Sequence, residues 1–314
     1  MKTEYSVSGG KLPCSVYVNS KEWDNLKAMR RKVEQDWDMI GLIVGKEGSG
    51  KSMYAFQRAL VLDSDFCLDR VVFNTKQFYN AVDNANPYDV IVWDEADTLG
   101  GHWASRIIQS LKRKFKRIRK NNLIILLVTP SFFDLNKYFT IHRLNFLVHV
   151  YAKGKGARLE RGHFRLFGGY KLKHLYINGK KYWNMWAPTF PVGYNRRNSK
   201  RSFRKSMCDL YGRFTKLPSG FPIDMDLYEE KKDESTAEIK AENEGEMKKV
   251  AVKNAKIRCV GGMYELFMED VDKASDVTHK MIGEKLGWRR DTISRYLIAW
   301  RKMKESGELD NFLT

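Results

Sequence analysis

The sequence contains few cysteines and histidines, and none of them recurs at a spacing that would bind zinc or form a redox pair. Four cysteines and six histidines are scattered over 314 residues. We therefore expect isolated, reduced thiols, which are usual in cytoplasmic proteins. A small secreted scaffold held together by disulfides is excluded.

Long apolar stretches are also missing. The longest apolar run is far shorter than the roughly 20 residues that span a bilayer. The first residues lack the succession of basic, apolar and small residues that directs export. The sequence therefore predicts neither a membrane span nor an export signal, and we expect a cytoplasmic protein.

Acidic residues are scarce relative to basic ones. The chain has 38 Asp and Glu residues against 56 Lys and Arg residues, which gives a formal net charge of +18 and a pI near 9.6. This excess favours a polyanionic partner such as DNA.

The positive charge gathers in two segments. Residues 112–120 read Lys-Arg-Lys-Phe-Lys-Arg-Ile-Arg-Lys, and the second segment contains Arg196, Arg197, Lys200, Arg201, Arg204 and Lys205. The first segment belongs to a predicted helix with an apolar stripe at spacings of three and four, formed by Ile107, Leu111, Phe115 and Ile118. Each segment would bind phosphates in a salt-dependent way, or would be a merely solvated basic surface. The DNA-contact candidates in the first segment are Lys112, Arg113, Lys116 and Arg117.

Residues 45–52 read Gly-Lys-Glu-Gly-Ser-Gly-Lys-Ser and follow an apolar run over 39–44 that predicts a strand. This is the complete phosphate-binding P-loop pattern. Its glycines let backbone N–H groups converge on the α- and β-phosphates, Lys51 reaches the β- and γ-phosphates, and the Ser52 hydroxyl ligates Mg²⁺. A helix beginning at Lys51 adds its positive dipole end. The sequence thus predicts ATP and Mg²⁺ as cofactors, with nucleotide contacts from Gly45, Lys46, Glu47, Gly48, Ser49, Gly50, Lys51, Ser52 and Met53.

A second apolar strand, predicted over 90–93, ends in Asp94 and Glu95, which is the Walker B pattern. Asp94 is predicted to hold the Mg²⁺ together with Ser52, and Glu95 to orient or deprotonate the attacking water. A catalytic glutamate directly after the metal ligand is typical of ATPases with an additional strand in the sheet. The letters of residues 94–97 also spell a helicase box. That interpretation is disfavoured, because companion arginine motifs and room for a second RecA-like domain are missing.

A third apolar run, over 123–128, predicts a parallel strand buried on both faces, and its end carries Thr129. In ATPases of this type the strand beside Walker B presents a polar residue to the γ-phosphate. Thr129 is therefore a candidate sensor of hydrolysis, with Ser131 as a substitute. The alternative is a hydroxyl that caps the turn before Pro130.

The remaining patterns predict the fold class. Strands alternate with helices, which indicates a RecA-like α/β core with a mostly parallel sheet and the ligand at the strand carboxyl ends. One predicted helix is capped by Asn19 or Ser20 and runs through about residue 34, a second covers 51–62, and a strand is predicted over 70–73. A β-rich extension follows, with strands over 142–151 and 163–167 and a hairpin over 170–186 that turns at Asn178-Gly179.

The composition changes after residue 228 to a charged stretch with almost no apolar residues, either a solvated linker or an exposed charged helix. We therefore expect an ATPase domain over 1–195, a basic extension over 196–228, a charged linker over 229–254 and a small all-α domain over 255–314.

Residues 281–297, in this last domain, resemble the helix-turn-helix of winged-helix DNA-binding domains. Gly287 would turn the chain between two short helices, and polar residues at the start of the second helix would enter the major groove. The candidates for DNA contact are Arg289, Arg290, Thr292 and Arg295. A three-helix protein-interaction module is the alternative.

The first 190 or so residues resemble the FtsK and HerA superfamily of DNA-pumping ATPases, and within it the compact viral and plasmid packaging and Zot-like proteins. The resemblance is carried by the order of P-loop, Asp94-Glu95, basic helix, Thr129 strand and Arg143. It implies a homo-oligomer, commonly a hexameric ring, that threads DNA and hydrolyses ATP between subunits. An arginine of one subunit would then complete its neighbour's site, with Arg143 as first candidate and Arg117 and Arg119 next.

The sequence as a whole predicts a Mg²⁺-dependent, DNA-binding ATPase, a translocation or packaging motor of a virus or mobile element. One alternative is a nucleotide-gated DNA-binding regulator or partition protein. A second is an AAA-type loader or transposition ATPase, which requires an arginine sensor in a helical lid, such as one from residues 201–213.

Overall fold

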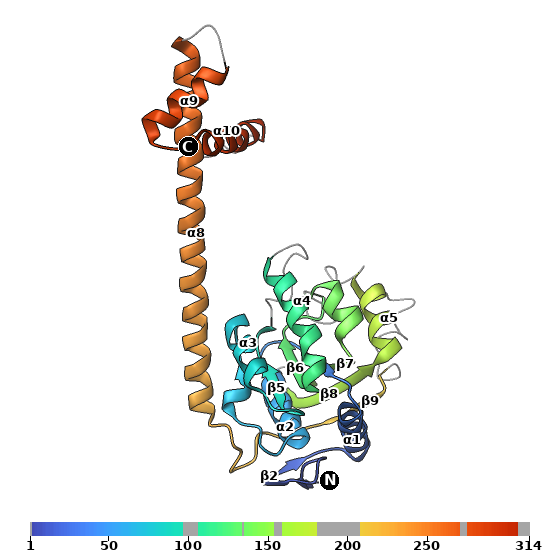
Figure 1. Cartoon of the computed structure of the whole chain (residues 1–314). Coiled ribbons are helices and arrows are strands. Elements are labelled where there is room, and N and C mark those ends of the chain that lie inside the picture. Colours follow the sequence, from blue (N-terminus) through green and yellow to red (C-terminus); the bar gives the residue numbers. More distant parts are fainter. Residues whose placement is uncertain are drawn as a thin grey trace. The chain divides into compact units, whose positions relative to one another are not determined.

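The computed structural model describes residues 2–96, 106–133, 135–153, 159–180, 208–270 and 275–306. The chain divides into two compact units, Met1–Thr236 and Ala237–Thr314 (Figure 1). The division falls inside a long helix, between residues 236 and 237. None of the described helices combines the length and the apolar character that crossing a bilayer requires.

The first unit is built on a sheet of seven strands among the described residues, in the order β4-β5-β6-β3-β7-β8-β9 (Figure 1). The strands from β4 to β7 are parallel to their neighbours, whereas β8 and β9 join as antiparallel strands. These strands are β3 (Met39–Val44), β4 (Val71–Val72), β5 (Val90–Trp93), β6 (Ile124–Thr129), β7 (Phe146–Lys153), β8 (Glu160–Gly168) and β9 (Leu210–Arg213). A separate hairpin is formed by β1 (Lys2–Tyr5) and β2 (Lys11–Tyr17).

Helices cover both faces of this sheet, which explains why its central strands are continuous apolar runs. In β6, Ile124, Leu126 and Val128 pack with the helices α1 and α2, while Ile125 and Leu127 pack with α3, α4 and α5. Successive side chains point to opposite faces. These helices are α1 (Ser20–Glu34), α2 (Lys51–Leu62), α3 (Thr75–Asn84), α4 (Arg106–Ile118) and α5 (Gly169–Lys180). Short helical turns cover Leu68–Arg70, Arg119–Asn121 and Phe139–Arg143.

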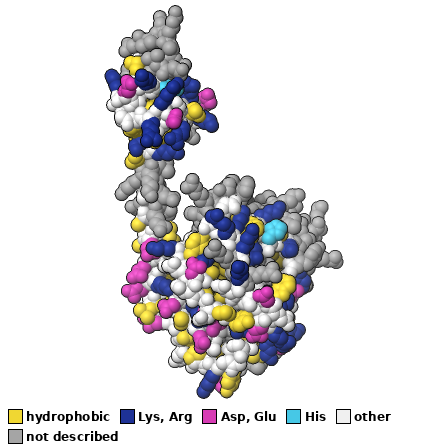
Figure 2. Space-filling model, in the orientation of Figure 1, with side chains coloured by type: hydrophobic (Ala, Val, Ile, Leu, Met, Phe, Trp, Pro, Cys, Tyr) yellow, Lys and Arg dark blue, Asp and Glu magenta, His cyan; other side chains and the backbone are white. Residues whose placement is uncertain are grey.

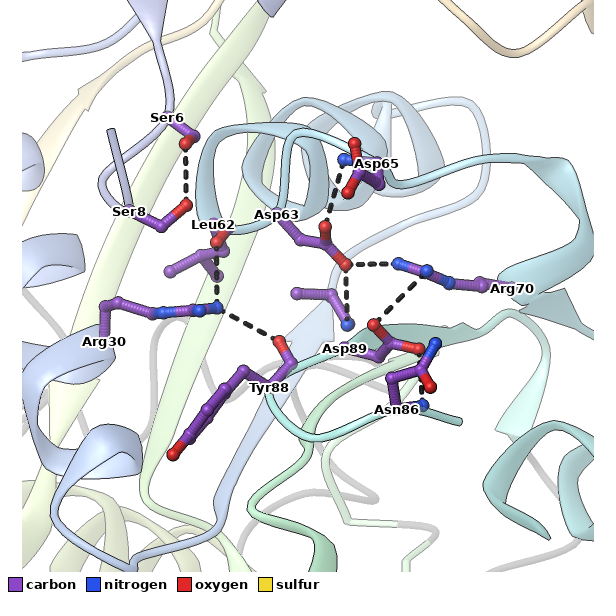
Figure 3. Close-up of polar contacts among 11 residues, drawn as sticks. Ser6, Ser8, Arg30, Leu62, Asp63, Asp65, Arg70, Asn86, Tyr88 and Asp89 are labelled. Atoms are coloured by element: carbon purple, nitrogen blue, oxygen red, sulfur yellow. Dashed lines mark hydrogen bonds and ion pairs between the residues drawn. The ribbon is translucent and has the colours of Figure 1, made fainter. Parts of the chain in front are cut away.

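A polar network fixes the start of β5, the strand that carries Asp94 at its other end (Figure 3). The Asp63 carboxylate, after the end of α2, accepts a hydrogen bond from the backbone N–H of Val90 at 3.1 Å and pairs with Arg70. Arg70 also pairs with Asp89 at 3.2 Å. From α1, Arg30 donates to the carbonyl oxygens of Leu62 and Tyr88. The network therefore fixes β5 relative to α1 and α2.

The second unit contains the later part of the long helix α8 (Met225–Asp270), with α9 (Ser275–Leu286) and α10 (Arg290–Glu305). Its small core consists of Val260, Ile282, Ile293 and Leu297. Gly287 lies between α9 and α10 with φ of +65°, a left-handed conformation that suits glycine. The predicted glycine turn between two helices is therefore present.

Most predicted elements are found, and one prediction, the hairpin, is wrong. The chain over 170–180 is the helix α5 and not one arm of a hairpin, because Leu172, Leu175 and Tyr176 recur at helical spacing and are buried against the sheet. The rest of the predicted hairpin, 181–186, and the basic cluster at 196–205 lie outside the described residues. Residues 229–254 form a helix, the second of the two alternatives, and the described part of the predicted basic extension, from residue 208, contains the strand β9.

Candidate nucleotide site

The P-loop follows β3 and leads into α2, as its sequence predicts. Gly45 packs so closely on the neighbouring strand that a Cβ would overlap the carbonyl oxygen of Val150. Gly50, with φ of +94°, turns the loop into α2 and provides no side-chain cap for that helix. The first N–H groups of α2 are therefore oriented for an anion in the loop.

Polar side chains of the loop also fit a phosphate ligand. The Ser49 hydroxyl is buried and has no hydrogen-bond partner among the described residues. The Lys51 ammonium donates to the carbonyl oxygen of Lys46 at 3.3 Å, across the loop. A buried hydroxyl and an ammonium in one loop provide donors for phosphate oxygens.

The sheet order brings the Walker B residues to the same edge of the sheet as the P-loop, one strand away. The strand β6 lies between β3 and β5, which confirms the prediction of an additional strand. Asp94 is only 3% exposed, and its Oδ1 accepts the backbone N–H of Glu95 at 3.0 Å. Glu95 has a φ of +57°, which is uncommon for a residue with a side chain and is often found at functional sites.

Asp94, Glu95 and most of the P-loop border one cavity of about 900 Å³ at the carboxyl edge of the sheet. This volume lies in the usual range for small-molecule sites, about 300 to 1,000 Å³. Residues 47–53, Asp94, Glu95 and Thr129 line it, together with Arg161 and Lys216, which the sequence did not indicate; the predicted nucleotide contacts Gly45 and Lys46 are not among the lining residues. The guanidinium of Arg161 lies over the loop, 3.9 Å from where a Cβ of Gly48 would be.

The donor set in this cavity suits Mg²⁺. Ser52 and Asp94 both line the cavity, and the ion prefers oxygen ligands and usually combines one or two carboxylates with substrate phosphates. The predicted ligand pair is therefore chemically consistent with Mg²⁺ held together with a nucleotide.

The start of α8 contributes two further side chains that the sequence did not indicate. The Tyr228 hydroxyl donates to Asp94 Oδ2 at 2.6 Å, and the Lys232 ammonium pairs with Glu95 at 2.8 Å. Burial and then the Asp94 charge raise the pKa of Tyr228 above its usual value. Burial lowers the pKa of Lys232, but its hydrogen bond to Glu95 and the charge there outweigh this effect and raise it.

Two other predicted residues have local partners. The Thr129 hydroxyl donates to the carbonyl oxygen of Ser131 at 3.0 Å, so it caps the turn; its role as a sensor stays a prediction. Arg143 lies just before β7, at the opposite edge of the sheet from the P-loop. There it pairs with Asp38 and donates to the carbonyl oxygen of Phe115 at 2.7 Å. Within its own chain Arg143 is therefore a structural residue, and its action on a neighbour stays a prediction.

The DNA-contact candidates lie on two helices, one in each unit. On α4, Arg113 and Lys116 are exposed, and Lys112 lies over the ring of Tyr138; the side chain of Arg117 lies outside the described part. At the start of α10, Arg289, Arg290 and Arg295 are exposed and Thr292 is half-buried. Figure 2 shows Lys and Arg side chains gathered over the α4 part of the core and, separately, on the C-terminal unit.

No protein-family model and no curated protein sequence matches this chain. Solved structures do match part of it. The DNA-packaging ATPase B204 from Sulfolobus Turreted Icosahedral Virus is 13% identical, with a TM-score of 0.32, over 42% of this chain and 93% of B204. The N-terminal domain of zonular occludens toxin from Neisseria meningitidis is 17% identical, with a TM-score of 0.29, over 42% and 84%. The flagellar accessory protein FlaH from Methanocaldococcus jannaschii is 18% identical, with a TM-score of 0.27, over 42% and 78%. Because these scores are low, the assignment of the site rests on the geometry of this chain.

Proposed function

We propose that this chain is a Mg²⁺-dependent ATPase that binds DNA and acts as a translocation or packaging motor of a virus or mobile element. The observation that carries the proposal is the single cavity in which a complete P-loop meets Asp94 and Glu95 across the inserted strand β6. This arrangement brings together groups for phosphates, for Mg²⁺ and for a water nucleophile.

The chemical roles follow from the positions of the side chains. The Lys51 ammonium would stabilise charge that develops on the β- and γ-phosphate oxygens, and the Glu95 carboxylate would accept a proton from the attacking water. Mg²⁺, held through Ser52 and Asp94, would neutralise charge on the same phosphates. Arg161 would be a further cation near the phosphates, and it belongs to the same chain as the P-loop.

DNA binding is supported by charge and by placement. The exposed cations of α4 and those at the start of α10 would neutralise phosphates, with α10 as the recognition helix of a helix-turn-helix. A homo-oligomeric ring, with Arg143 acting between subunits, is part of the same proposal. An arginine in that role would first have to leave its pair with Asp38.

The test is steady-state ATP hydrolysis by the full chain at fixed salt, with no DNA, a short duplex and a long duplex. Lys51→Ala serves as the inactive control. A motor predicts hydrolysis that rises with duplex length and is absent in the variant. Activity that persists in Lys51→Ala would refute the site.

A nucleotide-gated regulator is the second candidate, and the contacts from α8 to Asp94 and Glu95 favour it, because they link the site to another part of the chain. A regulator predicts slow hydrolysis that responds to a specific DNA site and not to duplex length. Of the arginines that the AAA-type alternative offers as a sensor, Arg213 lies on the edge strand β9 and not in a helical lid, and those within 201–207 lie outside the described residues.

A further inference from the structure

One face of the first turns of α8 docks on the candidate ATPase site through polar side chains. We call Tyr228, Lys231, Lys232 and Ser235 the docking face, because their spacing of three and four places them on one side of the helix. Each of them has a hydrogen-bond or ion-pair partner in the core, and two of these partners are Asp94 and Glu95.

Tyr228 engages the residues that would hold Mg²⁺. Its hydroxyl donates to Asp94 Oδ2 at 2.6 Å, and Tyr228 and Ser52 line the same cavity. Because Asp94 Oδ1 accepts the N–H of Glu95, both oxygens of this carboxylate already have a donor. A metal ion or its water shell would compete with the phenol for the same oxygen.

Lys232 engages the predicted catalytic base. Its ammonium lies 2.8 Å from Glu95 Oε1, so one oxygen of the carboxylate is already paired with a cation. Glu95 is also held in the left-handed backbone conformation. Such strain often marks residues that change conformation during function.

Lys231 and Ser235, the other two residues of the docking face, hold the start of α8 against the core. Lys231 donates to the carbonyl oxygens of Leu68 and Val71 at 2.9 and 2.8 Å, and Ser235 accepts from Asn74 at 3.0 Å. The Tyr228 ring, only 2% exposed, packs on Phe56 and Phe73. Tyr228 therefore cannot leave Asp94 by rotation into solvent, and the first turns of α8 must shift.

We propose that the docking face is an autoinhibitory contact, and that docked α8 and bound Mg²⁺–nucleotide compete for Asp94 and Glu95. The inference rests on the proposed ATPase function and adds its regulation. Binding of Mg²⁺–nucleotide releases the first turns of α8, and any partner that pulls this helix away favours binding.

The first experiment is hydrogen–deuterium exchange of the full chain with Mg²⁺ and the non-hydrolysable analogue AMPPCP, compared with the chain alone. Protection of residues 45–53 reports that nucleotide has bound. We expect residues 226–236 to exchange faster at the same time, by roughly tenfold, as local contacts open. Protection of the P-loop with unchanged or slower exchange over 226–236 overturns the competition.

The same experiment distinguishes failure of the proposed nucleotide site from failure of the proposed competition. If AMPPCP with Mg²⁺ leaves the P-loop unprotected, the nucleotide site itself is refuted and this inference falls with it. In Lys51→Ala, both the P-loop protection and the change in α8 should be lost.

A second experiment titrates Mg²⁺ against AMPPCP binding, measured by calorimetry. Tyr228→Phe keeps the packed ring and removes the hydroxyl, and Lys232→Met removes the charge. For Tyr228→Phe we expect half-maximal binding at Mg²⁺ at least about tenfold lower, the effect of one hydrogen bond to a charged group. For Lys232→Met we expect a decrease of up to about fivefold, the effect of a half-exposed ion pair. The matched controls Tyr211→Phe and Lys21→Met, both at exposed positions, should stay within about twofold. Weaker binding after Tyr228→Phe would instead make Tyr228 a positioning residue of the metal site.

Discussion

Two carboxylates, Glu22 and Glu95, each pair with a cation on a helix, but their surroundings differ. Glu22 accepts two hydrogen bonds of 2.7 Å from Arg58, and the side chains are 1% and 3% exposed. Glu95 has a single contact of 2.8 Å with Lys232, and these side chains are 48% and 30% exposed. A fully buried pair cannot open without leaving an unpaired charge in the core, whereas a half-exposed pair can exchange its partner for water. The first pair therefore fixes α1 on α2, and the second is suited to respond to a ligand.

Of all changes at these two pairs, Glu95→Gln should have the largest effect, a loss in the rate of ATP hydrolysis. Loss of a general base lowers the rate by about 10² to 10⁴. We expect ATP hydrolysis to fall by at least about 100-fold, while calorimetry still detects bound AMPPCP. Hydrolysis near the unmodified rate would show that Glu95 is not the base.

Glu22→Gln should affect the fold instead. It leaves the Arg58 guanidinium buried without a compensating charge, and breaking such a pair costs about 3 to 5 kcal/mol. Urea denaturation should show this loss in the free energy of unfolding. A loss below about 1 kcal/mol would place the pair in the class of weak surface ion pairs.

Arg143→Ala tests a pair of intermediate burial, in which Arg143 and Asp38 are 18% and 14% exposed. We expect the free energy of unfolding to fall by about 1 to 3 kcal/mol, because the Phe115 carbonyl also loses its donor. Hydrolysis by mixtures of this variant with Lys51→Ala tests the proposed role between subunits. Activity in the mixture above the sum of the separate proteins would indicate a shared site.

Lys232→Met should have the smallest effect on stability. An exposed ion pair contributes about 0 to 1 kcal/mol, so the free energy of unfolding should change by less than about 1 kcal/mol. A loss comparable to that of Glu22→Gln would remove the distinction between the two pairs.

The sequence predicted those parts of the site that are contiguous in the chain. An apolar strand followed by polar residues, as at residues 39–52 and 90–95, indicates that these polar residues lie at the carboxyl edge of a parallel sheet. The β6 strand was predictable for the same reason. The helix α5 was mistaken for a hairpin, because an Asn-Gly pair signals a turn only when no buried helical stripe, such as that of Leu172 and Tyr176, competes with it.

The contribution of α8 was missed because its signal is polar. Tyr228 and Asp94 are 134 residues apart, and searches for helical periodicity count apolar residues. The spacing of residues 228, 231, 232 and 235 was visible in the sequence, but lysine, serine and tyrosine at such positions also occur on solvated helices. Only the partners in the core distinguish the two cases.

The contacts of the docking face also depend on which side of α8 faces the core. Each residue advances an α-helix by about 100°, so one residue inserted after Met225 would turn Tyr228, Lys231, Lys232 and Ser235 away from the core together. Substitutions there remove contacts one at a time, whereas a single insertion removes all of them and leaves the P-loop and both acidic residues unchanged. Length variation in this short segment is therefore a direct route by which such a chain could gain or lose its restraint in evolution.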